Sequence, residues 1–177
     1  MSHEADALPR AGRVLKGGAA GAAASVALDY EGRLLRRKRL VTDAGWAFLV
    51  DLPEVTSLDG GDALALSDGR HVGIVAAEEA LLAVTATTQA GLARLAWHVG
   101  NRHTPCRIEA ERLLIRADHV LADMLRQLGA EVTPVTGPFK PEGGAYGHGR
   151  TFGHAHDHVH GHDHDHDHDH GHVHGAT

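Results

Sequence analysis

Apolar and polar residues alternate along the first part of the chain with the two-residue period of β-strands. The alternating apolar positions are Val26, Leu28 and Tyr30, followed by Trp46, Phe48 and Val50. Residues 62–77 predict a β-hairpin, because two strand-like runs, 63–66 and 72–75, flank a Ser67-Asp68-Gly69 turn. We therefore predict that residues 1–77 form an N-terminal all-β domain.

A helical period replaces this alternation further along the chain. In the first predicted helix, Thr87 or Thr88 serves as N-cap, Gly100 as a left-handed C-cap, and the apolar face is Leu92, Leu95, Ala96 and Val99. The second begins at Asp118, ends at Gly129, and has Leu121, Met124, Leu125 and Leu128 on one face. Both helices are thus amphipathic, with one side available to cover a sheet.

Four short strand-like stretches surround the two helices, at residues 81–84, 106–109, 112–115 and 131–135. The resulting order, β-α-β-β-α-β, is that of the ferredoxin-like fold. We predict such a domain over residues 78–142. The fold class is therefore α+β, with an all-β domain, a ferredoxin-like domain, and a tail from residue 143 onward.

The tail, residues 143–177, contains too few apolar residues to bury a core, so we expect it to be disordered. The chain has 17 histidines, and twelve of them lie here. Residues 148–177 carry Arg150 against five aspartates, a net charge of −4 with neutral imidazoles. The candidate ligands in the tail are His148, His154, His156, His158, His160, His162, His164, His166, His168, His170, His172 and His174.

Alternating His and Asp side chains favour divalent metal binding by the tail. Imidazole suits Ni²⁺, Zn²⁺, Cu²⁺ and Co²⁺, and neighbouring carboxylates add oxygen ligands. A chain of this length has a root-mean-square span of about 30 Å, enough to reach its own folded body. A purification tag would normally contain consecutive histidines, and this tail has none; a solvated low-complexity segment remains the other simple interpretation.

Composition excludes several classes of protein. No run approaches the roughly 20 apolar residues of a membrane helix, so we predict no membrane association. The N-terminus has acidic residues and no apolar signal-peptide core, and one cysteine cannot form an internal disulfide, which together favour a cytoplasmic location. A formal net charge of −6 gives no reason to expect nucleic-acid binding.

Five histidines lie in the body of the chain. His3 is expected in a frayed terminus, His71 on a solvent-facing strand, and His98 at a helix end, where a cation complements the dipole. His103 falls in an exposed turn between helix and strand, where metal ligation and a non-functional surface position are equally compatible with the sequence. His119 opens the second helix and is either a ligand or structural.

Three further features have simpler interpretations. Cys106, three residues from His103, resembles a nucleophile beside a base, but its strand placement favours a buried, inert thiol. The basic run of residues 33–39 indicates a solvated face or, alternatively, a surface for an acidic partner. The glycine-rich stretch at residues 17–21 lacks the Lys and Ser/Thr of a phosphate-binding loop.

Three motifs stand out along the second half of the chain: Trp97-His98-Val99-Gly100-Asn101-Arg102-His103-Thr104-Pro105, Asp118-His119-Val120-Leu121-Ala122-Asp123-Met124-Leu125, and Gly137-Pro138-Phe139-Lys140-Pro141-Glu142-Gly143-Gly144-Ala145-Tyr146. Together they resemble the UreE family of urease accessory nickel metallochaperones. Leu58-Asp59-Gly60-Gly61-Asp62 also looks like the N-terminal domain of that family. The resemblance covers nearly the whole chain.

The resemblance implies a homodimer in which His103 meets its symmetry mate and the pair holds one Ni²⁺, supplemented by tail histidines. Where some family members have a His-Xaa-His pair before the second helix, this chain keeps only His119. The implied function is delivery of Ni²⁺ to apo-urease together with an accessory GTPase, without catalysis. A nickel or zinc storage protein is the alternative, and an enzyme with a metal-bound water is a third possibility.

Overall fold

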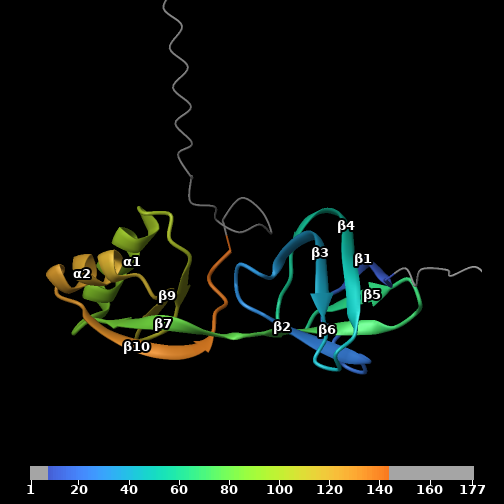
Figure 1. The fold of residues 1–177 in the computed structure, drawn as a ribbon. Helices are drawn as coiled ribbons and strands as arrows, with labels where there is room; N and C mark the ends of the chain where they lie inside the picture. Colours follow the sequence, from blue (N-terminus) through green and yellow to red (C-terminus); the bar gives the residue numbers. More distant parts are fainter. Residues whose placement is uncertain (1–7, 144–177) are drawn as a thin grey trace, which may run out of the picture.

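The computed structural model describes residues 8–143, so the expected disorder of the tail, its twelve histidines and His3 lie outside the described residues. The described chain is a mixed α+β protein with two sheets and two helices. Figure 1 shows the sheets at opposite ends of an elongated molecule. None of the helices within residues 8–143 is long and apolar enough to cross a membrane.

The first sheet has six strands in the order β2-β6-β5-β1-β4-β3. They are β1 (Arg10–Leu15), β2 (Ala24–Leu28), β3 (Leu34–Val41), β4 (Ala47–Ser57), β5 (Ala63–Leu66) and β6 (His71–Ala76). The predicted hairpin of residues 62–77 is confirmed, because β5 and β6 pair in antiparallel register. Inward-facing Phe48, Val50 and Leu64 are fully buried, so the alternation marks the core side of this sheet.

The second sheet has four strands in the order β10-β7-β9-β8, with both helices on one face (Figure 1). Its elements are β7 (Glu78–Thr85), α1 (Gln89–Gly100), β8 (Cys106–Ile108), β9 (Leu113–Arg116), α2 (His119–Gln127) and β10 (Glu131–Pro138). The observed element order is the expected β-α-β-β-α-β. The apolar faces of both helices pack on Leu82, Val84 and Ile115.

The opposite face of this sheet is covered where the two sheets meet. Tyr30 and Phe139 pack there on Leu81, Ala83 and Leu114. Their ring centroids lie 5.3 Å apart in an edge-on arrangement. Because β7 is buried on both faces, residues 81–84 form a continuous apolar run instead of an alternating one.

Arg33 corrects part of the expectation for the basic run, because it is 2% exposed whereas residues 36–39 are exposed as expected. Its guanidinium donates hydrogen bonds to the carbonyl oxygens of Phe139 and Leu58. The backbone N–H of Tyr30 also donates to Glu79 Oε1 at 2.6 Å. A buried cation thus joins the six-stranded sheet to the segment after β10, which sequence alone could not indicate.

Candidate metal-binding site

Helix α1 begins at the predicted cap but ends differently from the prediction. The Thr88 hydroxyl accepts a hydrogen bond from the backbone N–H of Gly91 at 3.0 Å. Gly100 lies inside the helix and has no left-handed conformation, so its assignment as a left-handed C-cap was wrong. Asn101 is the C-cap instead, and its N–H donates to the carbonyl of Trp97.

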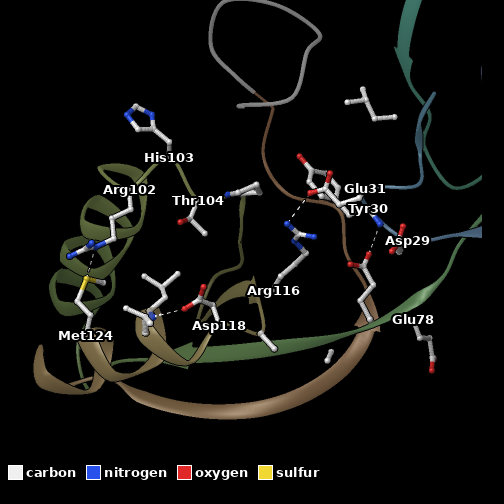
Figure 2. Close-up of a pocket in the computed structure, with 17 residues that line it drawn as sticks. Asp29, Tyr30, Glu31, Glu78, Arg102, His103, Thr104, Arg116, Asp118 and Met124 are labelled. Atoms are coloured by element: carbon white, nitrogen blue, oxygen red, sulfur yellow. Dashed lines mark hydrogen bonds and ion pairs between the residues drawn. The ribbon is translucent and has the colours of Figure 1, made fainter. Parts of the chain in front are cut away.

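His103 is the residue that takes the left-handed conformation after α1. Its φ is 53°, the only positive value found for a residue other than glycine within residues 8–143. Its backbone N–H donates to the carbonyl of Gly100 at 2.9 Å, which closes the turn. The side chain is exposed, and Figure 2 shows the imidazole pointing away from the helices. Residues other than glycine held in this region cluster at functional sites, which makes His103 a candidate.

Helix α2 begins as predicted. Asp118 Oδ1 accepts a hydrogen bond from the N–H of Leu121 at 2.8 Å. His119 is the first residue of the helix and is exposed. Exposure at the first residue of the helix does not distinguish a ligand from a structural residue, so the metal-binding role of His119 remains a prediction.

The loop after α1 and the start of α2 border one cavity of about 1080 Å³ between the two sheets. Arg102 Nε lies 2.8 Å from the sulfur of Met124 and joins the end of α1 to α2. Across the cavity, Arg116 forms a 2.9 Å ion pair with Glu31, which belongs to the turn before β3 (Figure 2). His103 is among the lining residues. The candidate ligand therefore stands beside the junction of the two sheets.

Two large apolar side chains near these helix ends face solvent. Trp97 in α1 and Val120 in α2 are each 64% exposed. Both lie off the faces of their helices that pack on the sheet, where Val99 and Leu121 are buried. Sequence analysis did not single them out, although their positions outside each apolar period are the signal that could have found them.

Cys106 is half-buried at the start of β8. Burial, together with the nearby charge of Glu142, raises the pKa of its thiol to about 11. Since the thiolate is the reactive form, this environment agrees with the expected inert thiol.

The other two body histidines within residues 8–143 are in the expected places. His71 is exposed at the start of β6, and His98 is half-buried in the last turn of α1, with its ring 4.9 Å from that of Trp97. No group of three or more His, Cys, Asp or Glu side chains that could hold a metal ion occurs within residues 8–143.

Fold and site together define a two-sheet α+β protein that presents an exposed, strained histidine at a helix end. Sequence models of the UreE urease accessory protein match the chain over residues 7–77, as its N-terminal domain, and residues 79–175, as its C-terminal domain. The chain belongs to the UreE family of urease accessory proteins.

Curated relatives named urease accessory protein UreE match most of the chain. The protein of Cereibacter sphaeroides is 60% identical over 149 residues, which cover 83% of this chain and 80% of the relative. That of Rhodobacter capsulatus is 62% identical over 146 residues, covering 82% and 91%. That of Paracoccus denitrificans is 61% identical over 144 residues, covering 81% and 90%.

Proposed function

We propose that this protein is a nickel metallochaperone that delivers Ni²⁺ to apo-urease during urease maturation. The proposal rests first on His103, an exposed imidazole held in a left-handed backbone conformation where glycine would be favoured. Family membership supports an accessory role in maturation. The function requires binding and release of the ion, and no catalytic residues.

We propose a homodimer in which His103 of each protomer contributes to one shared ion. A two-fold contact doubles every ligand, so one histidine per chain supplies two imidazoles. The exposed Trp97 and Val120 support this partner, because they offer apolar surface on the same two helices whose ends flank His103. A second copy of the chain would cover them.

The tail histidines are proposed to collect ions and pass them to His103. The described chain reaches Glu142, whose N–H donates to the carbonyl of Cys106 at 2.8 Å, so the tail starts close to the loop that carries His103. The proposed partners are the accessory GTPase and apo-urease, in the cytoplasm, without nucleic acid or membrane. Zn²⁺, Cu²⁺ and Co²⁺ also suit these ligands.

Calorimetric titration with Ni²⁺ tests the assignment. Three forms are compared: the full chain, a chain ending at Gly147, and the full chain with His103→Ala. We expect one tight ion per dimer in the first two and loss of that ion in the third, with weak sites only where the tail is present. If all binding disappears with the tail and His103→Ala changes nothing, the protein is a nickel or zinc storage protein instead.

A further inference from the structure

The six-stranded sheet carries a basic patch along β3, which we define as Arg10, Arg36, Arg37, Lys38 and Arg39. All five residues are exposed, but those of β3 alternate in direction: Arg37 and Arg39 pair with Asp51 and Leu49 of β4, whereas Lys38 pairs with buried Val50. The cations therefore flank both sides of this edge strand. Asp51 pairs with Arg10 and Arg37, each at 2.8 Å, and hydrogen bonds from Arg37 and then Arg10 lower the pKa of its carboxyl group. Counting Asp51 and Glu54 against the five cations leaves a net charge of +3.

Exposed cations without an ion pair elsewhere within residues 8–143, such as Arg13 and Arg94, are separated along the chain, whereas three such cations fall within β3. Elsewhere many exposed cations have a carboxylate of their own, as in the pairs Lys16–Asp62, Arg70–Asp68, Arg116–Glu31, Arg126–Asp123 and Lys140–Asp59. Arg36, Lys38 and Arg39 form no ion pair with any residue between 8 and 143. Their charge is thus available to an acidic partner.

The patch lies on an open edge. Strand β3 is the last in its sheet and pairs there with β4. Just beyond the end of β3, Asp43 exchanges hydrogen bonds with Ser25 of β2. Cations on an edge strand also prevent sheets from pairing with one another, so exposure alone does not identify a ligand.

The chain's own tail is an acidic segment with the charge that would complement this edge. Residues 144–177 carry five aspartates and one arginine, a net charge of −4 with neutral imidazoles, opposite in sign to the patch. The described chain ends at Gly143, four residues after Phe139. The carbonyl of Phe139 accepts a hydrogen bond from Arg33, the residue just before β3. Further along, the N–H of Glu142 donates to the carbonyl of Cys106 at the start of β8, so the described chain ends at the junction of the two sheets, between Arg33 and β8.

We propose that the acidic tail, residues 144–177, docks through its aspartates on the basic patch of its own protomer. A random-coil chain of 34 residues would span about 30 Å, and the eight residues of β3 extend over about 26 Å, so this length is sufficient to run along β3. Tethering also gives a high effective concentration, which compensates for the weakness of each exposed charge pair. Docking would hold the tail histidines along the six-stranded sheet, away from His103. This goes beyond the proposed function and depends on no particular metal.

Paramagnetic relaxation enhancement in the full chain tests the proposal. A nitroxide label is attached at Thr177→Cys in a Cys106→Ser background, with chelator present to keep the tail free of metal. We expect amide signals of residues 36–39 to broaden several-fold more than those of α2. Triple reversal with Arg36→Glu, Lys38→Glu and Arg39→Glu should remove the difference, as should salt of about 1 M, which shortens the Debye length to about 3 Å.

Controls separate docking from general charge effects. Reversal of three cations outside the patch, Arg94→Glu, Arg107→Glu and Arg126→Glu, changes the net charge equally and should leave the broadening in place. Converting Asp163, Asp165, Asp167 and Asp169 to lysine in the reversed patch variant should restore it. The proposal is overturned if broadening is uniform over residues 8–143, if patch reversal leaves it unchanged, or if it arises only between labelled and unlabelled copies in a mixed sample.

Discussion

Helices α1 and α2 are followed by similar backbone conformations but by different residues. After α2 the left-handed position is Gly129, with φ of 89°, where a glycine has no steric cost. After α1 it is His103, with φ of 53°. A left-handed conformation costs a residue with a side chain about 1–2 kcal/mol, although His tolerates it better than most. The end of α2 therefore has no steric cost, whereas the end of α1 places a residue with a β-carbon, and an exposed imidazole, in a conformation that favours glycine.

The largest expected effect is on Ni²⁺ affinity, which should depend on His103 far more than on His119. Replacing His103 by Asn keeps a residue that tolerates the left-handed region and removes the imidazole. We expect affinity for the tight Ni²⁺ ion to fall by about 100-fold or more, by analogy with losses of even outer-shell groups at metal sites. Calorimetry on a chain ending at Gly147 measures this without the tail.

His119→Ala is the comparison at the start of α2: if His119 is only structural there, the tight site should stay within about threefold of its original affinity, the scatter expected of a surface position. Equal losses in both variants would place the ion between the two helices instead of at the end of α1 alone.

The contrast between the helix ends also shows what sequence could and could not reveal. Asp118, Thr88 and Gly129 were predictable because caps depend on local chemistry. Gly100 was misassigned because a glycine near the end of an apolar period looks like a C-cap whether or not the helix continues through it. His103 itself was a candidate from its loop position, but its conformation follows from the turn that closes onto Gly100.

Tertiary contacts explain the other features that the sequence did not predict. Strand β1 was not predicted, since Arg10–Leu15 has weak alternation and becomes a strand by pairing between β4 and β5. Arg33 was expected on a solvated face, but its partners Leu58 and Phe139 are remote in sequence. The candidate site was thus predictable where ligand chemistry is local, and the junction beside it was not.

Cys106 should be chemically unreactive, although only three residues separate it from the exposed His103. With a thiol pKa of about 11 against the ordinary value of 9.0, alkylation near pH 8 should be about 100-fold slower in the folded than in the unfolded chain, because only the thiolate reacts. Iodoacetamide labelling followed by mass spectrometry measures the two rates.

The raised pKa of Cys106 also fixes the direction of its effect on stability. As the pH rises, the thiol loses its proton at a lower pH in the unfolded chain than in the folded chain. The contribution of the protonated thiol to the free energy of unfolding is therefore complete below pH 9 and is lost as the pH rises through about 11. A fast reaction of the folded protein at pH 8 would contradict the inert thiol and reopen a nucleophilic role.

Gly129→Ala and Gly100→Ala should change stability in opposite directions. An added Cβ meets no atom within 4 Å at either position, so only backbone conformation distinguishes them. At Gly129 the positive φ should lower the free energy of unfolding by about 1–2 kcal/mol. At Gly100, within the helix, alanine should raise it by about 0.5–1 kcal/mol. Urea denaturation of both variants gives the signs, and a loss at Gly100 would mean that α1 ends where the sequence suggested.

The caps at the helix starts should have smaller and similar effects. Asp118→Ala and Thr88→Ala each remove one hydrogen bond to a backbone N–H and should lower the free energy of unfolding by about 1 kcal/mol. Asp118→Asn keeps the accepting oxygen and should recover most of the loss. If Asn does not recover it, the carboxylate charge matters at the start of α2 beyond capping, for example through the cavity that Asp118 lines.

The smallest expected effect, on the free energy of unfolding, tests most directly whether the left-handed conformation of His103 reduces stability. His103→Gly removes the side chain that disfavours a φ of 53°, but glycine also increases the entropy of the unfolded chain. The balance should raise the free energy of unfolding by about 0.5 kcal/mol in the metal-free protein, while His103→Ala lowers it. Urea denaturation with chelator present compares the two variants with the original protein. If His103→Gly is no more stable than His103→Ala, the backbone at residue 103 bears no strain. The exposed imidazole then costs the protein no stability.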